Sequence, residues 1–246
     1  MALPATLVAA GVPGRAGTAT LLHDNGPIVT RAGAGAGGAD ASVVQTQMGN
    51  VSYGANHGLT GGFRVADDFD VPEGGWIIDT ITVYAYEAGS STSSTIQSVN
   101  LRIWNGVPGE PGSSVVFGDT TTNRMLGSGF ANVYRVAPTA LTDPARPVMA
   151  SVVTLGGLQL SEGSYWLDWQ SAGTPGTDPW TPFVTIDDGP LKPGSNARLL
   201  DPGTQAWQRL RDAGSNKSQD LPFAIVGRSA GDRIFANGFD MAGSPR

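Results

Sequence analysis

The sequence contains no cysteine, and this absence excludes disulfide bonds, thiolate nucleophiles and thiolate metal ligands. Histidine is scarce as well, because only His23 and His57 are present. A Ser-His-Asp hydrolase would need one of them as its base, oriented by a carboxylate, but His23 and its neighbour Asp24 would point to opposite faces of a strand. A catalytic metal site rich in histidine would need more of them. His57 lies in a loop-like stretch where we expect it to be solvated, so we predict no catalytic residue of these classes.

Charge and long apolar runs are also in short supply. Charged residues make up 15% of the chain, and the formal net charge is −6. Proteins that bind nucleic acids need basic patches that displace counterions, so we expect no nucleic-acid partner. No run of about 20 apolar residues occurs, so we also predict no membrane-spanning segment.

Glycine and proline, in contrast, are abundant, with 35 and 17 among 246 residues. A chain rich in these residues and poor in charge is typical of β proteins with many turns. This length fits one large all-β domain or two smaller ones, and it can bury a core without disulfide bonds.

The clearest strand signal is the stretch 76–86, which is rich in β-branched and aromatic residues and is bounded by glycine on both sides. Strict alternation would place Ile77, Ile81, Val83 and Ala85 on one face, with Asp79 as an exception there. The other face would carry Trp76, Ile78, Thr80, Thr82, Tyr84 and Tyr86. Both faces have apolar side chains, so we predict a strand in the centre of its sheet.

Similar short stretches recur along the chain with turn residues between them, and no stretch has a sustained helical period. The predicted strands are 18–23, 63–71, 76–86, 96–104, 115–118, 130–137, 148–155, 164–170, 183–186, 197–200, 205–210 and 222–226, with a strand or helix at 42–48. We predict an all-β fold, a jelly-roll-like antiparallel β-sandwich in a single domain over residues 18–227. An N-terminal segment (1–17) would precede it, as an ordinary terminus or the remnant of a signal peptide, and a C-terminal tail (228–246) would follow.

Five segments of the predicted domain carry a resemblance to known proteins. They are residues 65–69 (VADDF), 74–86 (GGWIIDTITVYAY), 101–106 (LRIWNG), 116–124 (VFGDTTTNR) and 165–170 (YWLDWQ). Together they resemble a group of secreted bacterial β-sandwich proteins without an assigned activity, over residues 21–227. Residues 232–240 (DRIFANGFD) resemble a short C-terminal signature of exported proteins in some Gram-negative bacteria, although six more residues follow here. The resemblance implies an extracellular or cell-surface location and identifies no site residues.

The aromatic residues are the main candidates for ligand binding. Six Trp and five Tyr are many for this chain, and flat rings exposed on a sandwich can stack on the apolar faces of sugars. Buried packing is the usual role of Trp, and we assign it to Trp76, Trp166 and Trp169. Trp180 and Trp207 lie near loops rich in Pro and Gly and are expected to be partly exposed. The predicted ligand-binding residues are Trp180, Trp207, Tyr84, Tyr86 and Trp104.

Carboxylates offer two further kinds of site. Asp67, Asp68 and Asp70 cluster near a strand end, where they could hold a structural Ca²⁺ through oxygen ligands or else cap turns. A structural Ca²⁺ is the only cofactor that the sequence suggests. A glycosidase would need two carboxylates across a cleft, and Glu87, Glu162 and Asp168 are candidates that the sequence cannot place relative to one another.

Three functions remain open at this point. The favoured one is a non-catalytic extracellular or cell-surface protein that binds carbohydrate or mediates adhesion, with a glycan or a cell-surface component as its partner. The first alternative is a secreted carboxylate-dependent hydrolase of glycosides or esters. The second is a self-assembling subunit of a surface filament or layer.

Overall fold

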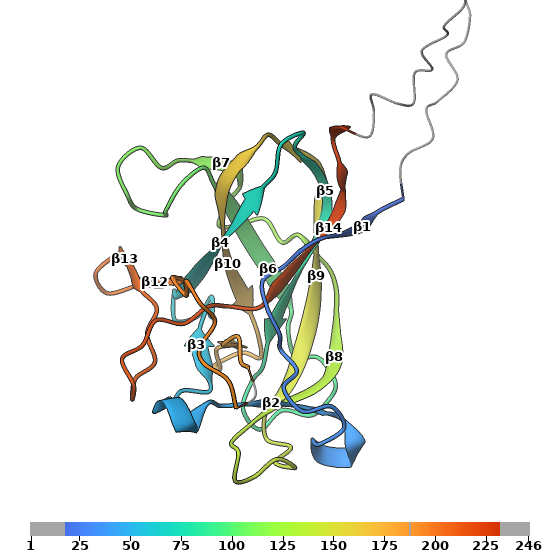
Figure 1. Ribbon diagram of the computed structural model, residues 1–246, viewed down its shortest axis with the longest axis vertical. Helices are drawn as coiled ribbons and strands as arrows, with labels where there is room; N and C mark the ends of the chain where they lie inside the picture. Colours follow the sequence, from blue (N-terminus) through green and yellow to red (C-terminus); the bar gives the residue numbers. More distant parts are fainter. Residues whose placement is uncertain (1–17, 187, 232–246) are drawn as a thin grey trace, which may run out of the picture.

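The computed structural model describes residues 18–186 and 188–231 (Figure 1). The N-terminal segment at 1–17 and the predicted signature at 232–240 lie outside these residues. The described part contains fourteen strands and two short 3₁₀ helices, η1 (Ala36–Gly38) and η2 (Thr46–Met48). None of its helices has the length and apolar character needed to cross a membrane.

Two six-stranded sheets and one small ribbon account for all of these strands. The first sheet has the order β1 (Thr20–Asp24), β14 (Phe223–Ser229), β5 (Trp76–Ala85), β9 (Pro147–Leu160), β8 (Met125–Val136) and β2 (Asp40–Val43). The second has the order β13 (Ala206–Arg209), β12 (Arg198–Asp201), β4 (Arg64–Val71), β10 (Gly163–Ala172), β6 (Ser98–Trp104) and β7 (Val115–Gly118). The ribbon pairs β11 (Trp180–Pro182) with β3 (Gly54–Asn56). Among these named strands, only β2 and β8 pair in parallel.

The core lies between the two sheets. It joins Ile81 and Val83 of β5 to Ile103 of β6 and to Leu167 and Trp169 of β10, and all five side chains are buried. On β10 the core residues Leu167 and Trp169 alternate with Trp166, Asp168 and Gln170 of the opposite face, which are buried as well. The predicted all-β antiparallel sandwich is therefore confirmed.

Strand β5 is central, as predicted, because it lies between β14 and β9. The predicted assignment of its faces is wrong, however. The pairing with β14 steps from Val226 opposite Thr80 to Gly227 opposite Ile78, which leaves Asp79 as one extra residue in β5. This β-bulge reverses the alternation, so Trp76 and Ile78 join Ile81 in the core.

Some predicted boundaries also need correction. Residues 183–186 are not a strand, and the neighbouring Trp180–Pro182 forms β11 instead. Phe183 and Val184 are buried, so their apolar pattern resembles that of a strand, but Val184 donates its backbone N–H to Asp220 outside any ladder. The stretch 42–48 contains both the end of β2 and the helix η2. Strand β3 is only three residues long, Gly54–Asn56, and was not predicted.

Candidate functional site

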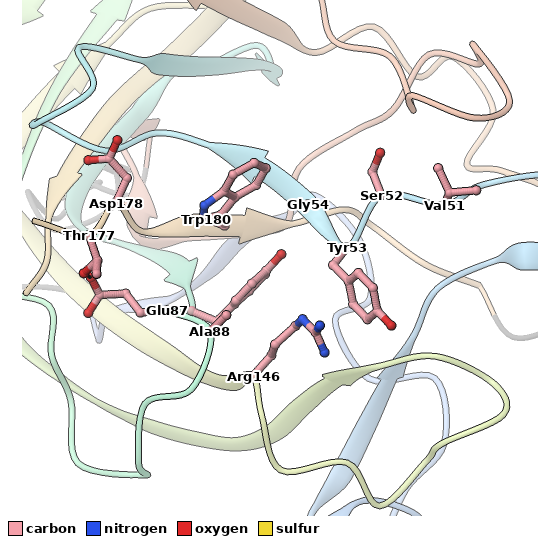
Figure 2. Close-up of a pocket in the computed structure, with 11 residues that line it drawn as sticks. Val51, Ser52, Tyr53, Gly54, Glu87, Ala88, Arg146, Thr177, Asp178 and Trp180 are labelled. Carbon is pink, nitrogen blue, oxygen red and sulfur yellow. Dashed lines mark hydrogen bonds between the residues drawn. The ribbon is translucent and has the colours of Figure 1, made fainter.

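A pocket of about 520 Å³ lies where the β3–β11 ribbon meets the end of β5 (Figure 2). This volume falls in the range that small-molecule sites usually occupy. The residues that line the pocket are Val51, Ser52, Tyr53, Gly54, Tyr86, Glu87, Ala88, Arg146, Thr177, Asp178 and Trp180. Most of them belong to loops, which the sheets hold in place.

Trp180 and Tyr86 form the aromatic centre of the pocket, and both were predicted to bind a ligand. Their backbones exchange two hydrogen bonds, from Tyr86 N to Trp180 O at 2.8 Å and from Trp180 N to Tyr86 O at 2.9 Å. Residues paired in this way point their side chains to the same side. Tyr86 is buried, whereas Trp180 is 41% exposed. The pair therefore presents a fixed aromatic surface to the pocket.

The ribbon that carries Trp180 depends on a glycine. A Cβ atom at Gly54 would collide with the carbonyl oxygen of Thr181 on the facing strand. Trp180 itself is paired with Asn56 across the ribbon. The backbone of Trp180 is consequently paired on one side with the ribbon and on the other with Tyr86.

One end of the pocket is cationic. The guanidinium of Arg146 lies 3.8 Å above the ring centre of Tyr53, and its Nη1 is 3.2 Å from Asp143. Behind this pair, the buried Arg135 donates from Nε to the Tyr53 carbonyl oxygen at 2.8 Å and from Nη1 to Ser42 Oγ at 3.0 Å. Burial lowers the pKa of Arg135 to about 10, so it remains charged at neutral pH. Two cations thus flank Tyr53.

The other end carries carboxylates that position a loop. Glu87 accepts hydrogen bonds from the Thr174 amide and hydroxyl, both at 3.0 Å, and from the Thr177 hydroxyl. A Cβ atom at Gly173 would collide with the Glu87 carboxylate, so this approach requires glycine. Glu87 is therefore held in place by the loop that it stabilises.

Asp178 has a similar role on the same wall. It accepts hydrogen bonds from Asn56 Nδ2 and from the Gly61 amide, both at 3.2 Å. Asp178 and Thr177 lie beside Trp180, whereas Arg146 and Tyr53 lie on the opposite side of the site (Figure 2). The pocket therefore offers an aromatic surface between an acidic wall and a basic wall.

The hydroxyl of Tyr86 stays protonated across the ordinary pH range. Burial is the main cause, and it raises the pKa of Tyr86 to about 12 even though Arg135 and Arg146 act in the opposite direction. The neutral hydroxyl can both donate and accept a hydrogen bond. The pocket can thus stack on a flat ligand and form hydrogen bonds with polar groups at the edge of that ligand.

The other predicted aromatic residues lie outside this pocket. Tyr84 packs partly buried against the cluster of Tyr86, Val133 and Val148. Trp104 donates its indole N–H to Asp168 at 2.9 Å on the outer face of the second sheet. Trp207, half-buried on β13, is closely approached by Gly109 of the β6–β7 connection. The expected partial exposure of Trp180 and Trp207 is confirmed, as is the burial of Trp76, Trp166 and Trp169.

The three aspartates predicted to hold calcium do not converge. Asp67 points to the inside and accepts hydrogen bonds from Asn25 Nδ2 at 2.8 Å and from the Leu221 amide at 2.7 Å. Asp68 and Asp70 alternate with it on the strand and bond to Asn196 and Ser164. Over residues 18–186 and 188–231, no group of three or more His, Asp or Glu could hold a metal ion. The calcium site stays a prediction without support from the geometry.

The candidate hydrolase carboxylates are also separated. Asp168 is fully buried and forms ion pairs with Arg64 and Arg102. Glu162 lies at the turn between β9 and β10, away from the pocket that Glu87 lines. Of these three predicted carboxylates, only Glu87 therefore lines the pocket beside Trp180.

His57 is buried, which contradicts the expectation that it is solvated. Its Nε2 lies 3.1 Å from Ser171 Oγ, and burial lowers its pKa to about 3. The backbone of the loop is tied to β10 through Ser171 N and His57 O, which draws the ring inward. His57 is thus a neutral core residue.

A scan against protein-family models found no match to this chain, and neither did a comparison with curated proteins. The function of the protein is therefore inferred from the chemistry of the pocket.

Proposed function

We propose that this protein is a non-catalytic extracellular or cell-surface β-sandwich that binds carbohydrate, and that the saccharide occupies the pocket beside Trp180. The observation that carries this proposal is the indole of Trp180, which stays 41% exposed next to Tyr86 in a pocket of about 520 Å³. An exposed large apolar side chain that lines a cavity is typical of a ligand site.

The surroundings of Trp180 suit a sugar better than a purely apolar ligand. A pyranose has an apolar face, which can stack on an indole, and an edge of hydroxyl groups that need directional partners. Asp178, Arg146 and Ser52 supply such partners around the rings. These groups are held by hydrogen bonds or stacking before any ligand binds, so little conformational freedom is lost on binding.

The carboxylates favour binding over catalysis. Glu87 already accepts three hydrogen bonds from the Thr174–Thr177 turn, and Asp178 accepts two from Asn56 and Gly61. A catalytic acid or base must reach the substrate with its carboxyl oxygens, whereas those of Glu87 are already engaged by Thr174 and Thr177.

The experiment is a glycan array followed by calorimetry on the sugars that bind. We expect Trp180→Ala to lower the affinity by about tenfold or more, since stacking on an aromatic ring contributes about 1–2 kcal/mol. The control is Trp207→Ala, which removes a partly exposed Trp outside the pocket and should leave binding unchanged. Binding that is indifferent to Trp180→Ala, or an array without any bound glycan, would refute the proposal.

A hydrolase remains the second candidate, because Glu87 and Asp178 line the same pocket. It predicts slow release of reducing ends or of acid from a polysaccharide or ester that binds, and loss of this turnover in both Glu87→Gln and Asp178→Asn. A protein that binds a glycan and leaves it intact over prolonged incubation would exclude this candidate.

A further inference from the structure

The two ends of the pocket differ in how their polar groups are already engaged. At the acidic end, both oxygens of Glu87 accept hydrogen bonds from Thr174 and Thr177. Asp178 is bonded to Asn56 and to the Gly61 amide. These neutral donors occupy the carboxylate oxygens, so the acidic wall is engaged in holding its own loops.

The basic end is different. The contact between Arg146 and Asp143 involves Nη1 of the guanidinium, which carries five N–H donors in all. The contact with Tyr53, in which the guanidinium carbon lies 3.8 Å from the ring centre, restrains the position of the guanidinium. Arg146 is therefore the polar group of the pocket that is best placed to bind an anion.

A second cation strengthens this preference. Arg135 is 1% exposed and donates to neutral acceptors, the Tyr53 carbonyl and the Ser42 hydroxyl. Its charge lies in a medium of low dielectric constant directly behind Tyr53, where electrostatic interactions are less screened than in water. The positive charges of Arg135 and Arg146 thus add at this end, where together they exceed the single negative charge of Asp143.

We infer that the pocket selects a saccharide that carries a carboxylate, of the hexuronic acid class, and that Arg146 is the residue that recognises this group. A guanidinium binds a carboxylate through two parallel hydrogen bonds, and the planar sugar carboxylate matches this geometry. The opposite edge of the ring donates its hydroxyls to Asp178, while its apolar face lies on Trp180. The inference rests on the proposed function and names the substrate class of the same site.

The test compares short oligosaccharides of pectin, alginate and glucuronan with their carboxyl-reduced, neutral counterparts by calorimetry. We expect the acidic member of a binding pair to bind about tenfold more tightly, as a charge-assisted contact implies. Arg146→Gln should abolish this difference, because it lowers the affinity for the acidic sugar about tenfold more than that for the neutral one. Arg209→Gln is the matched control, because Arg209 is exposed on β13 outside the pocket and the variant has the same net charge.

The outcomes separate the two proposals. Equal affinity for acidic and neutral sugars, with binding still lost in Trp180→Ala, overturns the inference and leaves the proposed function standing. A preference for the acidic sugar that survives Arg146→Gln also overturns it. Absence of binding by either form, on a glycan array as well, refutes the proposed function and the inference with it. If Arg146→Gln fails to fold, Arg146→Lys is the alternative variant. It retains the charge but lacks the planar guanidinium that forms two parallel hydrogen bonds, so we expect it to lose most of the preference for the acidic sugar.

Discussion

Tyr86 and Trp180 exchange two backbone hydrogen bonds at the point where the central strand of the first sheet ends, and both side chains face the pocket. Tyr86 directly follows β5, so the aromatic floor is attached to an inner strand of the first sheet, which lies between β14 and β9. The pocket and the core are therefore joined through one strand, although Trp180 and the core residues are expected to differ in their contribution to stability.

This difference leads to the first prediction. Trp180→Ala should lower the free energy of unfolding by about 1–2 kcal/mol, because Trp180 is 41% exposed and buries only part of its surface. Trp169→Ala, at a fully buried position, should cost about 3–5 kcal/mol. Denaturant titrations of both variants measure this contrast. A large loss of stability in Trp180→Ala would mean that the indole serves the fold instead of a ligand.

The second prediction concerns the buried ion pairs on the outer face of the second sheet. Asp168→Asn should destabilise the protein by about 3–5 kcal/mol, because Arg64 and Arg102 would lose a shared buried carboxylate. Asp79→Asn is the matched control, since the Asp79–Arg228 pair is partly exposed and should cost at most about 1 kcal/mol. Thermal melts of the two variants compare them, and similar losses would show that burial does not set the cost.

The third prediction is a dependence of stability on pH. Burial, followed by repulsion from Asp220, raises the pKa of Asp67 well above its ordinary value. A group whose pKa is raised by folding contributes stability below its unfolded pKa, and this contribution is lost as the pH rises through the folded pKa. The free energy of unfolding should therefore decline as the pH rises above the ordinary carboxyl range.

Asp67→Asn isolates this contribution. Denaturant titrations across pH 4 to 8 should give a flatter profile for the variant than for the parent protein. An unchanged slope in Asp67→Asn would assign the pH dependence to another group.

The fourth prediction tests the wall of the pocket. Gly173→Ala should displace the Glu87 carboxylate, cost about 1–3 kcal/mol of stability and weaken saccharide binding, because the added methyl group overlaps Glu87. Gly127→Ala is the control, since a Cβ atom at that position has no neighbour within 4 Å. Calorimetry measures the affinity of both variants for the saccharide, and melting curves measure their stability. Full binding by a folded Gly173→Ala protein would show that the position of Glu87 is unimportant for the ligand.

The sequence predicted the sandwich because alternation along single strands is a local property. Ile103 on β6 and Leu167 and Trp169 on β10 lie in the core, on the faces that their period of two indicates. The faces of β5 were not predictable in the same way. The extra residue Asp79 is a consequence of pairing with β14, which lies far away in the sequence.

The site was predictable only in part, for a similar reason. Trp180 and Tyr86 stand out as aromatic residues near turns, and the structure brings them together. Tyr53, Arg146 and Asp178 come from three other loops and carry no local pattern that distinguishes them from ordinary loop residues. The ribbon and the contacts at the ends of the sheets bring these three residues together.

The ribbon of β3 and β11 has a consequence for how such a protein could diversify. Its two strands are only three residues long, and the remaining walls of the pocket come from separate loops. Substitutions in these loops would alter ligand preference while the two large sheets kept their packing. Related chains could thus share one scaffold and recognise different molecules. A comparison of their loops would show which positions change with the ligand.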